Sequence, residues 1–228
     1  MTIAANLADV ESRIARACAD AGRPRESVRL LPVSKTWPVS AVRELAGLGY
    51  RRFGENRPQE LAAKASELAA EGIEFAAIGR LQRNKARIVA EHAAEFQALD
   101  DVRLALDLNR RAAEAGRTLD VLVQVNTSDE PQKGGVAPEE VVSFAREVAS
   151  CEALVVRGLM TLAVFSSDPV VVRPCFRRLV GVQGVLRDEV PDLSWDELSM
   201  GMSGDFELAI AEGATCVRVG QAIFGVRG

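Results

Sequence analysis

Short strand-like segments and helical patterns alternate along almost the whole of this 228-residue chain. Eight segments are apolar or rich in β-branched residues over a few positions, which is typical of strands in a parallel sheet. They are residues 28–34, 50–54, 73–79, 95–100, 120–126, 154–163, 195–200 and 215–220. Amphipathic helical patterns separate them, so we expect parallel strands joined by helical crossovers. Eight is the strand number of a (β/α)8 barrel.

The two ends of the chain refine this expectation. After the last strand-like segment only residues 221–228 remain, too few for a full closing helix. The first 22 residues have the pattern of a long amphipathic helix. We therefore predict one α/β domain over residues 1–228, a TIM-like barrel in which the N-terminal helix replaces the closing helix. A doubly wound open sheet stays as the alternative, because the strand patterns at 50–54 and 95–100 are weak.

Composition narrows the classes of function. The net charge is −4 with Lys and Arg spread along the chain, which argues against nucleic-acid and membrane-surface partners. No apolar run approaches the roughly 20 residues of a membrane span, and no signal or transit peptide is recognisable. Four scattered cysteines indicate a reduced, cytoplasmic protein. The single histidine, His92, argues against a multi-histidine metal site or a Ser-His-Asp triad, so we expect no metal.

In such a barrel, the loops that follow the strands form the site, often with a phosphate held after strands seven and eight. The motif SMGMSGD at 199–205 combines a hydroxyl with two glycines that let backbone amides approach an anion, and RVGQ at 218–221 supplies another glycine turn. Together they predict a phosphate site. The alternative is that SGDFE only caps a helix, which would explain its acidic residues but not Ser199 and Gly201.

Lys35 ends the apolar segment VRLLPVS, although burying an ammonium is costly. A lysine at the lip of a barrel and partly desolvated has a lowered pKa, and its neutral amine condenses with carbonyls to form an imine. A lysine that merely extends to solvent is equally consistent with its position. An aldehyde that carries a phosphate would satisfy both Lys35 and the glycine turns, and pyridoxal 5′-phosphate (PLP) is such a molecule.

Along the chain stand, in this order, six motifs: VSKTWP, FGENRPQE, IGRLQRNKAR, VNTSDEPQKGG, GLMTLA and LSMGMSGDFELAIAEGATCVRVGQAIFG. Together they resemble the pyridoxal phosphate homeostasis protein family, single-domain relatives of the alanine racemase barrel. The resemblance implies a barrel that carries PLP as a covalent imine on Lys35. It also implies phosphate contacts at Ser199, Met200, Gly201, Gly220 and Gln221, an arginine at the pyridine nitrogen in Arg218, and a site-lining asparagine in Asn56.

The chain departs from the family pattern in two places. Histidines that the family usually carries around its strand-three motif are replaced by Ala76 or Ala77 and by Arg80. Roles given to those histidines therefore do not transfer to this chain. Gln221 stands where family members often have threonine, and it keeps only the backbone N–H as a donor.

An arginine beside the pyridine nitrogen disfavours electron-sink chemistry, because arginine does not act as an acid at neutral pH. We expect a monomeric PLP-binding protein of vitamin B6 homeostasis without strong catalytic activity, and PLP-dependent apo-enzymes as recipients of the cofactor. A weak amino-acid racemase stays open, although the only tyrosine, Tyr50, is expected on the wrong side of the barrel. A barrel that forms its imine with a sugar phosphate is the third alternative.

Overall fold

The computed structural model describes residues 2–225 and contains one sheet of eight parallel strands in the order β1-β8-β7-β6-β5-β4-β3-β2. The strands are β1 (Arg29–Pro32), β2 (Arg52–Glu55), β3 (Glu74–Ala77), β4 (Glu95–Leu99), β5 (Leu119–Gln124), β6 (Leu154–Met160), β7 (Glu197–Ser199) and β8 (Cys216–Val219). A bridge between Val33 and Gly54 brings β1 against β2. The sheet therefore curls into a barrel, as predicted, and the open-sheet alternative is wrong.

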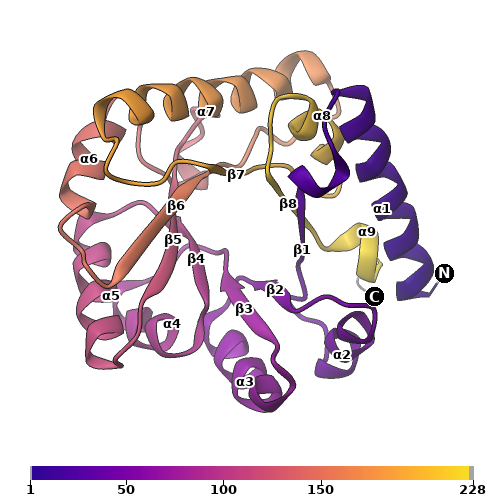
Figure 1. Cartoon of the computed structure of the whole chain (residues 1–228), viewed down its shortest axis with the longest axis horizontal. Helices are drawn as coiled ribbons and strands as arrows, with labels where there is room; N and C mark the ends of the chain where they lie inside the picture. Colours follow the sequence, from indigo (N-terminus) through magenta and orange to yellow (C-terminus); the bar gives the residue numbers. More distant parts are fainter. Residues whose placement is uncertain (1, 226–228) are drawn as a thin grey trace.

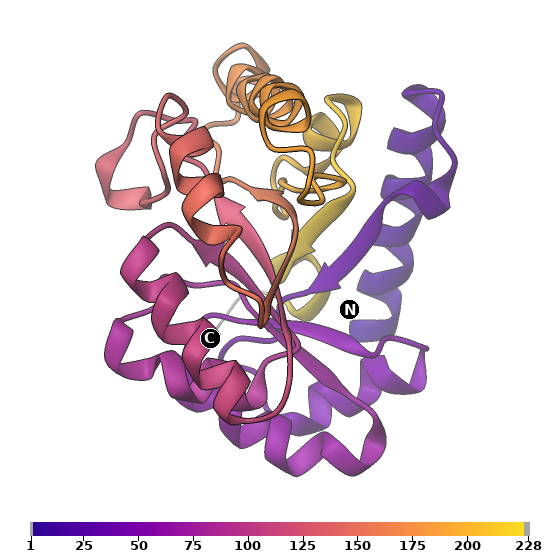
Figure 2. The same ribbon diagram turned by 60° about the vertical axis from the view of Figure 1, so that its left-hand side comes forward.

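Helices surround the strands on the outside (Figures 1 and 2). They are α1 (Ile3–Asp20), α2 (Val39–Gly47), α3 (Pro58–Leu68), α4 (Ala86–His92), α5 (Val102–Glu114), α6 (Val141–Val148), α7 (Pro169–Glu189), α8 (Phe206–Ala211) and α9 (Gln221–Phe224), with short 3₁₀ turns at Arg25–Ser27, Ala69–Glu71, Arg83–Lys85 and Pro131–Lys133. Each predicted strand segment overlaps one observed strand, with β2 ending one residue later than predicted and β5 beginning one residue earlier, and each crossover contains a helix. The ends of the predicted domain, residues 1 and 226–228, lie outside the described residues.

Helix α1 takes the place of the closing helix, as predicted, and lies beside α8 and α9 (Figure 1). Asn6 donates its side-chain N–H to the carbonyl oxygen of Ile223 at 2.9 Å. Arg13 pairs with Glu207 at 2.6 Å, and its guanidinium lies 4.6 Å from the ring centre of Phe206. Residues three or four positions apart form the buried face of the helix, namely Leu7, Val10, Ile14 and Cys18.

Side chains alternate between the two faces of each strand, which separates an outer core from the barrel interior. Phe53 and Phe75 pack outward in the large apolar cluster under the helices. Leu31, Ala76 and Cys216 form a separate small cluster inside the barrel. Because the strand period is two, the inward position of Leu31 on β1 is followed by an inward position at Val33, and Lys35 lies in the turn just beyond.

Within residues 2–225, no helix is long and apolar enough to cross a membrane. The same residues contain no group of three or more His, Cys, Asp or Glu side chains that could hold a metal ion.

Candidate functional site

The turn that carries Lys35 follows β1 and lies beside the glycine turn that follows β8. Pro32 pairs with Val219, and Val33 N–H donates to the carbonyl oxygen of Val219 at 2.9 Å. Lys35 is two residues beyond Val33, and Gly220 is one residue beyond Val219. Lys35 is half-buried, so it does not extend fully into solvent. The register of β1 and β8 thus places an amine-bearing turn and a glycine turn at neighbouring strand ends.

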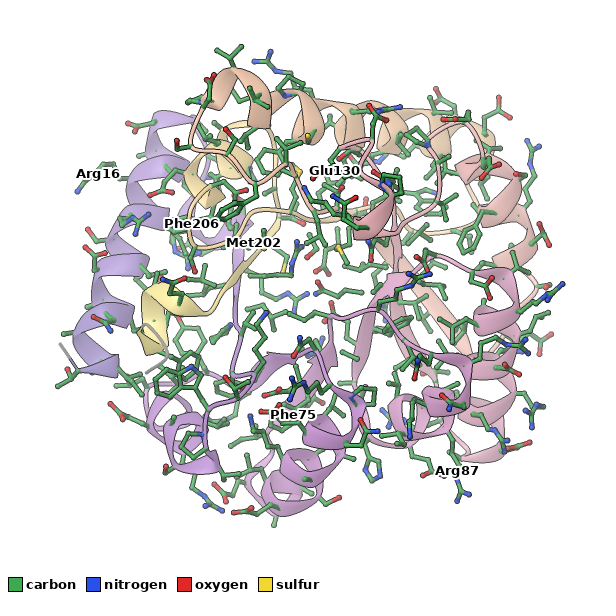
Figure 3. All side chains as sticks on the ribbon, turned by 180° about the vertical axis from the view of Figure 1, so that it is seen from behind. Arg16, Phe75, Arg87, Glu130, Met202 and Phe206 are labelled. Carbon is green, nitrogen blue, oxygen red and sulfur yellow. The ribbon has the colours of Figure 1, made fainter. Side chains whose placement is uncertain are left out.

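The turn between β7 and α8 requires glycine at position 201. Gly201 has φ +94°, and a Cβ there would lie 2.7 Å from the Cβ of Ala209. Asp205 Oδ1 accepts a hydrogen bond from Met202 N–H at 2.6 Å, and this bond closes the turn (Met202 is labelled in Figure 3). Asp205 makes no side-chain hydrogen bond to the first turn of α8. The side chain of Asp205 therefore shapes the turn. The alternative from the sequence was that SGDFE only caps the helix, and Asp205 makes no such capping bond.

Ser203 connects the two glycine turns. The backbone N–H of Ala222, after β8, donates to Ser203 Oγ at 3.3 Å. A Cβ at Gly220 would lie 3.1 Å from the carbonyl oxygen of Val33, so Gly220 allows the β8 turn to approach β1 closely. Successive backbone N–H groups in turns of this kind form concave anion sites. Sequence reasoning did not single out Ser203, although its hydroxyl lies in the same SMGMSGD motif.

Arg218 is buried and directs its guanidinium into the barrel. Its Nη1 donates to Ser199 Oγ at 2.7 Å, and its Nη2 donates to the carbonyl oxygen of Thr161 at 2.8 Å. Burial lowers the pKa of Arg218, yet an arginine pKa is high enough that the group stays protonated. Ser199 Oγ in turn donates to Gln97 Oε1 at 2.7 Å. The Ser199 hydroxyl thus has Arg218 and Gln97 as partners, and a contact between Ser199 and phosphate stays a prediction.

A chain of polar side chains continues from Gln97 toward the N-terminal end of the barrel. Gln97 Nε2 donates to Glu95 Oε1 at 2.5 Å, and the Glu95 carboxylate pairs with Arg29 at 3.1 Å and Arg52 at 3.2 Å. Burial acts to raise the pKa of Glu95, but the charge and hydrogen bond of Arg29, the hydrogen bond of Gln97 and the charge of Arg52 together lower this pKa. Sequence reasoning missed these residues. The alternation of Glu95 and Gln97 with the apolar Phe96 was the available signal.

The other predicted site residues occupy different surroundings. Asn56 and Gln221 are exposed and lie just after the ends of β2 and β8. Met200 is buried, and its N–H donates to the carbonyl oxygen of Cys216 at 3.0 Å. Ala76, one of the two positions at which the family usually has the first strand-three histidine, packs inside the barrel. Arg80, at the position of the second histidine, is exposed.

Tyr50 precedes β2 and therefore lies at the opposite end of the barrel from the glycine turns. Its hydroxyl donates to Glu11 on α1. The position confirms the expectation that this tyrosine is on the wrong side of the barrel for the site.

Comparison with known proteins gives matches over the full chain. The alanine racemase N-terminal domain family matches residues 5–228. The pyridoxal phosphate homeostasis protein of Escherichia coli K12 is 42% identical over 228 residues, covering 99% of this chain and 97% of that protein. That of Pasteurella multocida Pm70 is 39% identical over 229 residues, covering 100% and 98%.

Two solved structures of PipY from Synechococcus elongatus PCC7942 are 36% identical to this chain and cover 98% of it and 100% of PipY. The form without PLP has a TM-score of 0.89, and the form with PLP bound has a TM-score of 0.86. The structure of alanine racemase from Streptomyces coelicolor A3(2) is 17% identical, with a TM-score of 0.75. The match covers 100% of this chain and 59% of the racemase chain, and at this identity it shows the shared fold alone.

The fold and the site define a (β/α)8 barrel with a lysine-bearing turn and two glycine turns at its mouth, built like the N-terminal domain of alanine racemase. By identity and coverage, the chain belongs to the pyridoxal phosphate homeostasis protein family. The family resemblance predicted from the six motifs is confirmed.

Proposed function

We propose that this protein binds PLP at the mouth of the barrel, with the cofactor joined to Lys35 as an imine. The observation that carries the proposal is the register of β1 and β8, which sets Lys35 beside the Gly220 turn. An amine on one side and a glycine-lined anion site on the other match the aldehyde and the phosphate of PLP. The homeostasis-protein names of the relatives and the PLP-bound form of PipY support it.

We assign the phosphate to the turns at 199–205 and 220–222. Gly201 and Gly220 let backbone N–H groups approach the phosphate oxygens, and Met200 and Gln221 flank these glycines. The Ser203 hydroxyl, in the first turn, accepts a hydrogen bond from the Ala222 N–H in the second. Ser199 contributes by orienting Arg218 through their 2.7 Å hydrogen bond. Asn56 lines the rim of the mouth after β2.

Arg218 limits the reactions that the bound cofactor can support. PLP supplies a reactive aldehyde and a ring that acts as an electron sink when its nitrogen is protonated. Arg218 at that nitrogen donates a hydrogen bond but does not deliver a proton at neutral pH. We therefore propose a protein that holds PLP and releases it to PLP-dependent apo-enzymes in the cytoplasm, without strong catalytic activity of its own.

The visible absorbance of the protein tests this assignment. Purified protein incubated with PLP and then separated from free cofactor is expected to show an imine band, and Lys35→Ala is expected to lack it. Lys85→Ala is the matched control, because Lys85 lies in the 3₁₀ turn Arg83–Lys85 after β3, a different loop from those that carry Lys35 and the two glycine turns. An unchanged band in the Lys35 variant would refute the assignment.

Racemisation separates the proposal from its alternative. A racemase needs a second base on the opposite face of the bound amino acid, and Tyr50 lies at the other end of the barrel. Incubation of the loaded protein with L-alanine or D-alanine is expected to give no racemisation above that of free PLP. Turnover that is lost in the Lys35 variant would support the racemase instead.

A further inference from the structure

The residues on both sides of Lys35 are anchored to the same buried ammonium group. Lys64, on α3, donates to the carbonyl oxygen of Ser34 at 2.8 Å. Its Nζ also lies 2.7 Å from Glu55 Oε1 and 2.9 Å from Glu60 Oε1. An ammonium group has three N–H donors, so these three acceptors match its full capacity.

The two carboxylates extend this anchoring to the turn itself. Ser34 Oγ donates to Glu55 Oε1 at 2.7 Å, and Thr36 N–H donates to Glu60 Oε1 at 2.5 Å. Lys35 therefore stands between two residues that are tied, directly or through a carboxylate, to Lys64. We call Lys64, Glu55 and Glu60 the α3 clamp.

The α3 clamp lies behind the strand ends and outside the barrel mouth. Gly54 faces inward, where a Cβ would contact Leu31, so the next residue of β2, Glu55, faces outward to α3. Glu55 is fully buried and Lys64 nearly so, at 0% and 5% exposure. Burial raises the pKa of Glu55, although hydrogen bonds from Lys64 and Ser34 act in the opposite direction. Burying these charges is costly, and Lys64 offsets that cost for both carboxylates.

The anchored turn contains a strained residue. Thr36 has φ +69°, in the left-handed region, and is one of two non-glycine residues with positive φ in the described chain. A β-branched residue rarely adopts this conformation, because its Cβ crowds the backbone. Such a conformation persists only where the surroundings hold it in place. The bonds of Thr36 to Glu60 and of Trp37 N–H to Ser34 O, 3.0 Å, are the restraints on this turn.

We propose that Lys64 is a positioning residue for Lys35: it holds the strained turn at 34–37, and this keeps Lys35 beside the Gly220 turn. The part of this inference that concerns cofactor binding rests on the proposed function. The part that concerns the turn does not, and it can be measured in the protein without PLP.

Amide hydrogen exchange in the protein without PLP is the first test. Lys64→Met removes the charge at nearly constant length, and loss of a charge-assisted hydrogen bond is expected to raise exchange at the Thr36 and Trp37 amides at least about tenfold. The Val33 amide, bonded across to β8, reports general loosening of the barrel. Glu60→Ala, at a half-buried side chain, is the second variant should Lys64→Met fail to fold, with the same rise expected at Thr36.

The second test uses PLP and a compensating substitution. Lys64→Met is expected to weaken imine formation at least about tenfold, because the turn no longer populates the productive conformation. Thr36→Gly in that background is expected to restore imine formation by about fivefold, since glycine adopts positive φ without the steric cost. A residue that only stabilised the core would not be rescued in this way, because glycine replaces none of its contacts.

The outcomes separate the two proposals. Unchanged exchange at Thr36 and Trp37, equal loosening at Val33, or no rescue by Thr36→Gly would overturn the role of Lys64. If the unmodified protein forms no imine, the proposed function fails, while the exchange measurement still decides whether Lys64 holds the turn.

Discussion

The Ser199 hydroxyl shows how one buried residue fixes another. It accepts a hydrogen bond from Arg218 and donates one to Gln97, both at 2.7 Å, and it is fully buried. Both partners would lose a bond without it, and a buried donor or acceptor left unpaired is more costly than the bond is favourable. The orientation of the Arg218 guanidinium in the candidate site therefore depends on this hydroxyl.

Ser199→Ala is accordingly expected to lower the free energy of unfolding by about 1–3 kcal/mol. Ser143→Ala is the control, because that side chain is exposed and its hydroxyl bonds the carbonyl oxygen of Glu140, the residue just before its own helix. The control is expected to change stability by less than about 0.5 kcal/mol. Urea unfolding followed by circular dichroism measures both, and equal effects would show that the bonds of Ser199 carry no special weight.

Sequence reasoning reached some of these residues and missed others for identifiable reasons. Lys35 was found because a charge at the end of an apolar strand is conspicuous. Lys64 was missed because a lysine in an amphipathic helix ordinarily faces solvent, and the only hint was its spacing of four residues from Glu60. The bonds of Ser199 join residues from different strands, so no local pattern could reveal them.

At the scale of elements, α1 completes the outer ring of helices beside α8 and α9. Helix α9 is only four residues long, and α1 lies against both it and α8. The long amphipathic pattern of the N-terminal helix was visible in the sequence, and so this arrangement could be predicted. The weak strand patterns at β2 and β4 follow from the charged and polar residues that these strands carry into the barrel, such as Glu95 and Gln97.

Ile14→Ala tests how much stability α1 contributes. Ile14 is fully buried in the α1 face that packs on the barrel, and truncation of such a residue is expected to cost about 2–5 kcal/mol. Arg16, two residues along, is exposed and points away from the molecule (Figure 3), so Arg16→Ala is expected to cost less than about 0.5 kcal/mol. A small effect of Ile14→Ala in thermal unfolding would show that α1 is only loosely attached.

At the scale of the whole molecule, the cysteines report on the closed core. All four are buried and free, and burial raises the pKa of Cys216 inside the barrel to about 12. Since the thiolate is the reactive form, burial limits access to all four thiols, and protonation further protects Cys216. Their placement is that of small core residues.

The native protein is therefore expected to react only slowly with a thiol reagent such as dithiobis(nitrobenzoate) at neutral pH. After unfolding in guanidinium, four thiols per chain are expected to react quickly. Rapid reaction of one cysteine in the native state would instead show that part of the barrel opens locally.

The site at the mouth depends on the same closure, since the Lys35 and Gly220 turns meet only because β1 and β8 pair in one barrel. Reduction of the PLP-loaded protein with borohydride, followed by peptide mass spectrometry, tests this account most directly. The account predicts one phosphopyridoxyl group per chain, on Lys35. A group on another lysine, or none after reduction, would contradict it.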